Sequence, residues 1–357
     1  MPAESLVGPV LVVGAGLIGA SVAMALTRAG ITAHIRDADP RVAHVASSRG
    51  AGSDRDPDGA PQLVVVATPP DHLSAEIARA LAAYPSAVVT DVGSVKAKPL
   101  AELTEATKEL GRYVGGHPMA GSERSGPLAS AADLFDGRTW AVVDRPDCDP
   151  AAVGLVDQLV ERCGAVVVYM STADHDSAVA RVSHLPHVVA ALTAGGLVEA
   201  PPEHLNLSGQ GLRDVTRVAA GDPELWRQIV TANASAVGEL LKQMRTQLDS
   251  LIDSLDSGDD AAVERVLRAG VAGTAAIPGK HGGPVLAQAT VVVAIPDEPG
   301  ALARLFTDAA DAGVNIEDLR IDHDPARAFG LMEIDVAEAG AEPLAESLRN
   351  RGWTAHR

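Results

Sequence analysis

The chain has 357 residues, enough for two or three domains, and 46% of them are hydrophobic. Aromatic residues make up only 3%, so Ala, Val and Leu must build the cores. The formal net charge of −18 argues against a nucleic-acid partner or an anionic membrane surface, since both need a basic face. An anionic substrate could bind only where arginines are concentrated locally.

Two features bear on the cellular compartment. Cys148 and Cys163 suit neither a disulfide framework nor a metal-ligand set, so we expect reduced thiols. The apolar stretch Val10 to Leu26 resembles a signal peptide, but no Lys or Arg precedes it and three glycines interrupt it. A cytoplasmic protein is the prediction.

The first predicted element is a buried parallel strand at Val10–Val13, because the run is short, continuous and β-branched. A GxGxxG loop and a helix from about Leu17 to Arg28 follow at once. The first glycine permits a tight turn, the second lets a pyrophosphate approach, and the third packs helix against strand. The helix N-terminus adds free N–H groups for the phosphates. The loop residues assigned to cofactor binding are Gly14, Gly16, Leu17, Ile18 and Gly19.

The second predicted strand, Thr32 to Arg36, ends beside an acidic residue. Asp37 follows Gly19 by 18 residues, where a carboxylate binds the adenosine ribose hydroxyls and repels a 2′-phosphate. The pattern therefore predicts NAD as the cofactor. Arg36 next to it leaves NADP open as the less favoured alternative.

The strand–helix alternation continues with a strand at Leu63–Ala67, a helix from Asp71 to Ala83 and a strand at Ala87–Asp91. The carboxyl ends of these strands share an edge with the glycine loop, so their turns should line the cofactor crevice. Further strands are expected near Thr139–Val143 and Ala165–Tyr169. From the turn after the Leu63–Ala67 strand, the residues assigned to cofactor binding are Thr68 and Pro69.

Two turns carry candidate catalytic residues. Ser94 could hydrogen-bond substrate or nicotinamide, or it could cap a helix that begins near Ala97. His117 lies in a Gly-rich stretch, residues 115–126, which we place in a loop after a strand that ends near Val114. A histidine there can exchange a proton with a substrate hydroxyl. The alternative is a turn histidine with its ring in solvent.

From Ala173 to about Ala272 the apolar period is helical and no strand is expected. A long apolar stripe near residues 229–255 needs a partner surface, and we predict a homodimer through it. Its members recur at three- and four-residue steps: Val237, Leu240, Leu241, Met244, Leu248, Leu251, Ile252 and Leu255.

Two polar clusters interrupt this helical region. His184 and His187 are three residues apart on one helical face, and Arg213 and Arg217 are four residues apart. No third ligand accompanies the histidines, so no metal is expected. They are either core histidines or part of a site. The arginines either form a solvated face or clamp a carboxylate in a crevice.

The remaining chain predicts a linker and a small α/β module. The linker is Gly- and Pro-rich, and beyond it the order βαββαβ is that of a ferredoxin-like fold. The expected fold class is thus α/β, with a Rossmann-type domain, an all-helical domain and a ferredoxin-like module. The expected limits are residues 1–171 for the dinucleotide-binding domain, 172–276 for the helical substrate and dimerisation domain, 277–287 for the linker, and 288–357 for the module.

Several motifs in combination resemble the prephenate/arogenate dehydrogenase family over roughly residues 8 to 272. The C-terminal module resembles an ACT domain, which usually binds a regulatory amino acid. The motifs that carry the resemblance are Gly14–Gly19, Asp91–Lys96, Gly116–Glu123, Ser183–His187 and Arg213–Arg217 ahead of Trp226.

The resemblance implies an oxidative decarboxylation, in which hydride passes from the ring carbon bearing the 4-hydroxyl to NAD⁺ while the ring carboxylate leaves as CO₂. By this resemblance His117 is the catalytic histidine and Ser94 helps to hold the hydroxyl. Arg217 binds a substrate carboxylate, with Arg213 as alternate. The remaining pocket residues implied are His184 and His187, with Ser122 and Glu123 as gating residues.

The leading hypothesis is a prephenate dehydrogenase of tyrosine biosynthesis, regulated by an aromatic amino acid at the ACT domain. Arogenate or an amino-substituted prephenate of secondary metabolism is the alternative substrate. The non-enzymic alternative is a regulator that senses NAD and an amino acid.

Overall fold

The computed structural model describes residues 5–121, 124–277, 287–323 and 329–357. The chain forms two compact units, Met1–Ile252 and Asp253–Arg357. The long helix α11, Ala234–Ser257, runs across the boundary between them.

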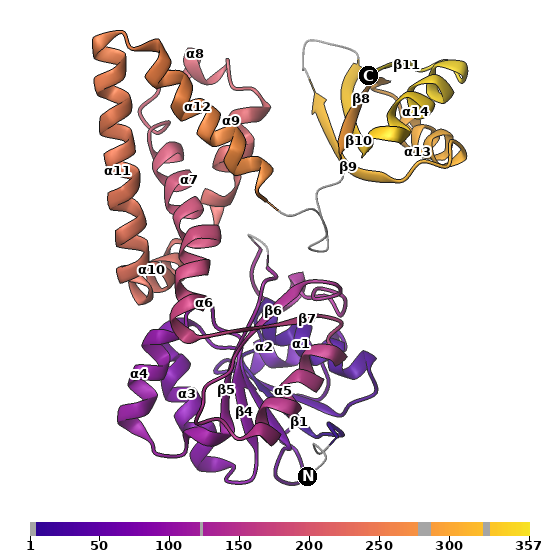
Figure 1. Cartoon of the computed structure of the whole chain (residues 1–357). Coiled ribbons are helices and arrows are strands. Elements are labelled where there is room, and N and C mark those ends of the chain that lie inside the picture. The colour runs from indigo at the N-terminus through magenta and orange to yellow at the C-terminus, as the bar shows by residue number, and fades with distance from the viewer. Residues whose placement is uncertain (1–4, 122–123, 278–286, 324–328) are drawn as a thin grey trace. The chain divides into compact units, whose positions relative to one another are not determined.

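A seven-stranded sheet organises the first unit (Figure 1), with the order β2-β1-β3-β4-β5-β6-β7. Strands β2 to β5 run parallel to β1, whereas β6 and β7 run the other way, because β6 pairs antiparallel with β5. The strands are β1 (Val10–Val13), β2 (Ala33–Arg36), β3 (Leu63–Val66), β4 (Val88–Asp91), β5 (Tyr113–Pro118), β6 (Thr139–Val143) and β7 (Val166–Met170).

Helices cover both faces of this sheet, so its central strands are apolar on both sides. Val10 and Val12 of β1 pack in one core with α1 and α5, while Leu11 packs in a second core with α3 and α4. Apart from the strand expected to end near Val114, the predicted strands and helices of this domain are confirmed to within about two residues at each end. The helices are α1 (Leu17–Arg28), α2 (Pro40–Ser48), α3 (Pro70–Ala83), α4 (Ala97–Ala106) and α5 (Pro150–Arg162), with 3-10 turns at Leu110–Arg112 and Pro127–Ala129.

Residues 172–275 are helical, as the sequence predicts, and the described part of this region contains no strand. A π-helical segment, Ala180–His184, joins α6 to α7 and precedes Pro186, which sits in the first turn of α7 where a missing N–H is tolerated. The other elements are α6 (Thr172–Val179), α7 (Leu185–Gly195), α8 (Pro202–Leu205), α9 (Gln210–Thr216), the 3-10 turn Arg217–Ala220, α10 (Pro223–Ala232) and α12 (Asp260–Ala275).

The C-terminal module has the predicted βαββαβ order and a four-stranded antiparallel sheet, β11-β8-β10-β9. Both helices contribute to one core against the same strands, so they cover one face (Figure 1). The predicted linker falls mostly outside the described residues. The elements are β8 (Gln288–Pro296), α13 (Ala301–Asp311), β9 (Ile316–His323), β10 (Phe329–Ala337), α14 (Glu338–Asn350) and β11 (Thr354–His356).

One expected loop is wrong. His117 lies inside β5 rather than in a loop beyond the strand, because residues 115–118 pair antiparallel with β6. Gly116 serves close packing here: a side chain would lie 2.7 Å from the Asp91 carbonyl oxygen and 2.9 Å from Trp140 Nε1. The glycine that suggested a loop is required by neighbours in the sheet.

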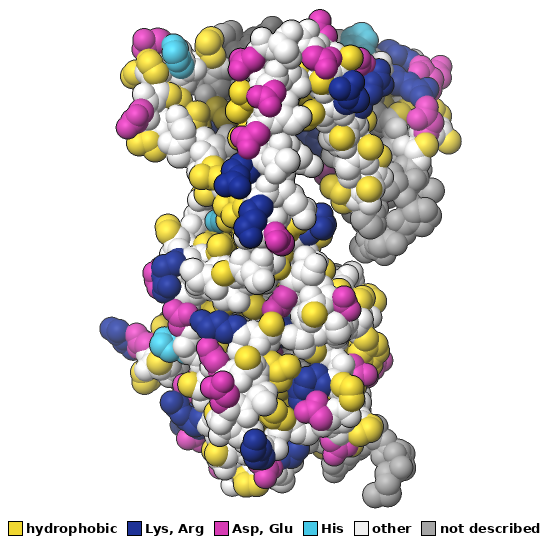
Figure 2. Space-filling view, turned by 60° about the vertical axis from the view of Figure 1, so that its left-hand side comes forward, with side chains coloured by type: hydrophobic (Ala, Val, Ile, Leu, Met, Phe, Trp, Pro, Cys, Tyr) yellow, Lys and Arg dark blue, Asp and Glu magenta, His cyan; other side chains and the backbone are white. Residues whose placement is uncertain are grey.

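The cysteines, the helices and the surface charge can be compared with what the sequence predicts. Cys148 and Cys163 are both free and buried. No helix within the described ranges is long and apolar enough to cross a membrane. Figure 2 shows acidic and basic side chains interspersed, without a continuous basic area on the face drawn.

Candidate active site

The glycine loop after β1 has the geometry that its three glycines predict. Gly14 has φ of +106°, and a side chain there would lie 2.4 Å from the Ala67 carbonyl oxygen. A side chain at Gly19 would lie 2.0 Å from the Gly14 carbonyl oxygen, so this glycine sets the approach of α1 to the loop. Open space surrounds Gly16, which caps α1 without a side-chain hydrogen bond. The loop can therefore receive a pyrophosphate against the helix N-terminus.

The residues around the adenosine end favour NAD. Asp37 accepts hydrogen bonds from the backbone N–H of Ala15 at 2.8 Å and of Asp39 at 3.0 Å, which fixes its carboxylate under the loop. Arg36 is paired with Asp56, with Nε 3.2 Å from Oδ1. The guanidinium is thus already neutralised by a carboxylate. Thr68, at the end of β3, has a buried hydroxyl with no partner among the described atoms, and Pro69 caps α3.

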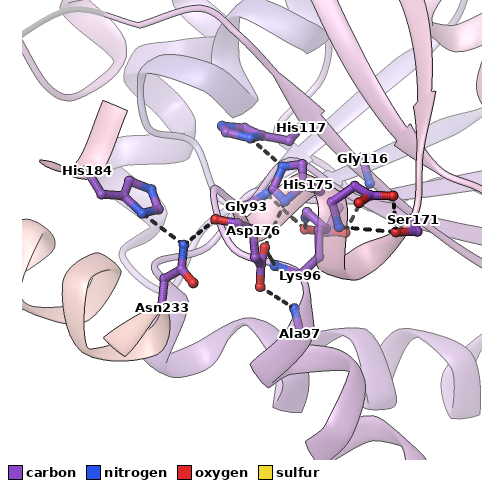
Figure 3. A network of polar contacts seen from close by, with 12 residues as sticks. Gly93, Lys96, Ala97, Gly116, His117, Ser171, His175, Asp176, His184 and Asn233 are labelled. Atoms are coloured by element: carbon purple, nitrogen blue, oxygen red, sulfur yellow. Dashed lines mark hydrogen bonds and ion pairs between the residues drawn. The ribbon is translucent and has the colours of Figure 1, made fainter. Parts of the chain in front are cut away.

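His117 is joined to a chain of two further residues (Figure 3). Its Nδ1 lies 2.9 Å from Nε2 of His175, and Nδ1 of His175 lies 2.8 Å from Oδ1 of Asp176. His175 and Asp176 come from α6, so the helical region completes the site that β5 begins. His117 is half-buried, whereas His175 is fully buried.

Asp176 anchors this chain to the sheet domain. Its carboxylate accepts hydrogen bonds from the backbone N–H groups of Lys96 and Ala97, each at 2.8 Å, and so caps the N-terminus of α4. Ser94 does not cap this helix; the N-cap is Lys96, and the acceptor comes from α6 instead. Lys96 Nζ forms a buried ion pair with Asp91 at the end of β4.

The electrostatics of the site follow from burial and these partners. Burial, then the neighbouring His175, Lys96 and His184, hold the pKa of His117 well below its ordinary value, so the ring is neutral near pH 7. Burial raises the pKa of Asp176, but the hydrogen bonds from His175, Ala97 and Lys96 prevail and lower it overall. A neutral histidine therefore faces an ionised carboxylate through a second histidine.

His184 and His187 are both buried and meet the same aromatic ring. His187 stacks on Trp226 with ring centroids 3.5 Å apart, and His184 approaches that ring edge-on at 6.3 Å. Asn233 Nδ2 lies 3.2 Å from His184 Nδ1, whereas His184 Nε2 is buried without a partner among the described atoms. Burial lowers the pKa of His184 to about 4 and also lowers that of His187.

The structure does not place the two arginines in contact with this network. Arg213 and Arg217 are exposed, and within the described residues neither has an ion-pair partner. The turn that Arg217 begins ends at Gly221, where a side chain would meet Trp226 and His187. The turn that Arg217 begins therefore adjoins His187 and Trp226. Ser122 and Glu123 lie outside the described residues.

No local sequence pattern identifies the residues that complete the network. His175 and Asp176 stand at the start of a helix in a polar run, Asp174–Ser177, that is indistinguishable from a solvated face. Asn233 lies between two helices and donates to the Asp176 carbonyl oxygen at 2.8 Å. These hydrogen bonds join residues that are distant in sequence, so only the tertiary structure reveals them. In the described part of the chain, no cluster of three or more His, Cys, Asp or Glu side chains could hold a metal ion.

Two family models match adjoining parts of the chain. The nucleotide-binding domain of prephenate dehydrogenase matches residues 22–169, and the dimerization domain of prephenate dehydrogenase matches residues 171–269. The chain is 34% identical to a protein of Streptomyces niveus described as a probable prephenate dehydrogenase, NovF, over 97% of this chain and 99% of that protein.

Solved structures agree with these matches. The prephenate dehydrogenase of Aquifex aeolicus, in complex with hydroxyphenyl propionate and NAD⁺, has a TM-score of 0.67 and 31% identity, covering 74% of this chain and 96% of that one. An arogenate dehydrogenase of Synechocystis has a TM-score of 0.61 and 29% identity, covering 73% and 96%. The glycine loop, the hydrogen-bonded histidine of β5 and these matches lead to one conclusion: the chain belongs to the prephenate dehydrogenase family, a family of NAD-dependent oxidoreductases.

Proposed function

We propose that the chain catalyses the oxidative decarboxylation of prephenate to 4-hydroxyphenylpyruvate with NAD⁺, in tyrosine biosynthesis. The observation that carries this proposal is the neutral His117, held by His175 at the sheet edge where the nucleotide loop also opens. When bound, NAD⁺ supplies the hydride acceptor. Gly16 and the uncapped N-terminus of α1 fit its pyrophosphate, and Asp37 fits its ribose.

The proposed chemistry needs one base and an ordered substrate. His117 accepts the proton of the 4-hydroxyl as the ring carbon that bears it loses hydride. The electron pair of the ring carboxylate bond enters the ring as CO₂ leaves, and the phenolic oxygen then recovers the proton from His117. Ser94, in the turn after β4, has no hydrogen bond to a described residue, so its hydroxyl is available to orient the 4-hydroxyl.

The arginine turn is proposed to bind the substrate dianion. Arg217 is the proposed partner of a substrate carboxylate, with Arg213 as alternate, because both guanidinium groups are exposed and no described carboxylate neutralises them. His184 and His187 are proposed to line the substrate pocket beside Trp226. Ser122 and Glu123 remain proposed gating residues.

The test is the rate of NADH formation by the purified chain, with prephenate and arogenate offered separately. Turnover with prephenate supports the proposal. Turnover with arogenate alone would support the same mechanism with arogenate as the substrate. An amino-substituted prephenate is the third substrate to offer. No turnover with any of the three, combined with tight binding of NAD and tyrosine, would support a sensor instead.

The C-terminal module is proposed to be an ACT domain that binds a regulatory aromatic amino acid. Its ferredoxin-like topology supports this assignment, as do its Pro-Gly turn before α13 and the Asn315 turn after it. Titration of the chain with tyrosine or phenylalanine, followed by calorimetry and by the initial rate, tests it. No binding of either amino acid would contradict the assignment.

A homodimer through residues near 229–255 is also proposed. On α11, Leu248, Ile252 and Leu255 are 53%, 46% and 62% exposed, so this part of the apolar stripe is uncovered in the single chain. The match to a dimerization domain supports the same partner. Light scattering measures the mass in solution, and a monomeric mass would contradict the homodimer.

We also propose the domain limits 1–171, 172–276 and 288–357. A reducing cytoplasmic environment is proposed as well, because it suits the two free thiols.

A further inference from the structure

Three residues outside the substrate assignments connect His117 to His184. His175 and Asp176 contact His117 on one side, and Asn233 contacts both Asp176 and His184 on the other (Figure 3). We infer that His175, Asp176 and Asn233 are positioning residues that fix His117 and His184 in opposite tautomers. His117 keeps a bare Nε2, whereas His184 carries its proton on Nε2.

The tautomer of His117 follows from the carboxylate at the end of its chain. Asp176 also accepts from two backbone N–H groups at the start of α4, so it is ionised and can only accept. Nδ1 of His175 must therefore carry a proton, and we assign its Nε2 as the acceptor in the contact with His117. The hydrogen bond between the two rings then requires a proton on Nδ1 of His117. Nε2 of His117 is left as an acceptor for a substrate hydroxyl.

The tautomer of His184 follows from an amide. One N–H of Asn233 Nδ2 donates to the Asp176 carbonyl oxygen, which fixes which end of the amide faces this cluster. The second N–H of the same nitrogen points to Nδ1 of His184, which must accept. The His184 proton is therefore on Nε2, the buried atom that has no partner among the described residues.

The consequence, which rests on the proposed function, is that the two rings offer the substrate one hydrogen-bond acceptor and one hydrogen-bond donor. His117 presents an acceptor suited to the 4-hydroxyl, and His184 presents a donor suited to a carboxylate or keto oxygen. The charged and titratable groups around His117 are His175 and Asp176 from α6, Lys96 at the start of α4, and His184. Because both histidines are neutral, the assignment of donor and acceptor depends on the tautomers alone.

The direct test reads the tautomers in the free enzyme. Histidine nitrogens are isotopically labelled, two-bond nitrogen–proton correlation spectra are recorded, and signals are assigned with His117→Gln and His184→Gln. We expect protonated Nδ1 for His117 and protonated Nε2 for His184. The reverse pattern at either ring overturns the inference. Because no substrate is present, this result does not depend on whether prephenate is turned over.

A matched pair at His175 separates positioning from mere packing. In His175→Asn the amide can keep the contact to Asp176 but cannot reach His117, whereas in His175→Gln the carbonyl can still accept from His117. We expect His175→Asn to lower kcat by about 100-fold with KM within about threefold, and His175→Gln to restore at least about tenfold of that loss. Equal losses in both variants, in step with equal losses of melting temperature, would show a structural role only.

Controls complete this comparison. His204→Asn changes an exposed histidine on α8 and should leave both constants and the His117 signals unchanged. Wild-type-like kcat in His175→Asn would overturn the positioning role. Absence of turnover by the wild-type chain would contradict the proposed function while the tautomer spectra still decide this inference.

Variants of Asn233 test the tautomer of His184. Asn233→Asp replaces a donor by a carboxylate, which can only accept, so His184 should move its proton to Nδ1. We expect its nitrogen signals to exchange and KM to rise about tenfold, with kcat changed less than about threefold. Asn233→Ala, which favours neither tautomer, should give mixed signals and an intermediate KM. Unchanged His184 signals in both folded variants would overturn this half of the inference.

Discussion

Two polar regions of the first unit differ in how they are held. Around His117, the side chains of His175, Asp176 and Lys96 are buried and hydrogen-bonded in a fixed order. At the end of α9 and on the turn after it, Arg213 and Arg217 are exposed and have no ion-pair partner within the described ranges. A proton-transfer group needs a set tautomer and pKa, and burial provides both. Arginines that bind a dianionic substrate, in contrast, must be accessible to solvent before the substrate binds.

The largest expected effect tests the buried region. His117→Asn should lower kcat by about 1,000-fold, because the base in contact with the reacting hydroxyl is removed. NADH formation at saturating prephenate measures it. His72→Asn, an exposed histidine on α3, is the control and should retain full activity. A loss of less than about tenfold in His117→Asn would move the proton transfer to another group.

The pH dependence of stability tests the same region through His184. Its pKa is about 4 in the folded chain and near 6.5 when unfolded, so the unfolded state binds a proton first as the pH falls. Stability from this residue is complete above about pH 6.5 and declines towards pH 4, by roughly 3 kcal/mol in total. His117, with its lowered pKa, acts in the same direction.

Urea unfolding across this pH range measures the decline. His184→Asn, whose carbonyl can still accept from Asn233, should flatten the dependence. An unchanged slope in that variant would show that other groups cause it.

The exposed region should respond in KM. Arg217→Ala should lower kcat/KM by about 10- to 100-fold, mainly through KM, because a charge-assisted hydrogen bond to a carboxylate is lost. Arg213→Ala is the matched variant and should have the smaller effect. If the order is reversed, Arg213 is the main carboxylate partner. A loss confined to kcat would contradict a binding role for either arginine.

The smallest effect concerns an arginine that does have a partner. Asp56→Asn should release Arg36 and raise kcat/KM with NADP⁺ by a few-fold relative to NAD⁺, since an exposed ion pair contributes only about 1 kcal/mol or less. Initial rates with each cofactor measure it. An unchanged ratio of kcat/KM for the two cofactors would show that Asp37 alone excludes the 2′-phosphate. Arg36 and Arg217 would then differ in function because of where they lie, and not because only Arg36 has an ion-pair partner.

Local sequence determined much of this protein. The continuous apolar strands, the glycine loop, Asp37 and the βαββαβ order of the tail all follow from the sequence, because strand burial and tight turns leave short-range patterns. The arginine and histidine clusters were also visible as i, i+3 and i, i+4 spacings.

Tertiary structure alone decided how the site is assembled. Gly116 indicates a loop by composition, yet it lies in β5 because it pairs with β6. The residue is glycine because Trp140 and the Asp91 backbone leave no room for a side chain. His175 lies 58 residues from His117 in sequence, and Asp176 caps a helix 79 residues before it. Such pairs leave no periodic pattern, because hydrogen bonds between distant segments depend on how the helices dock onto the sheet, and local propensity does not encode that docking.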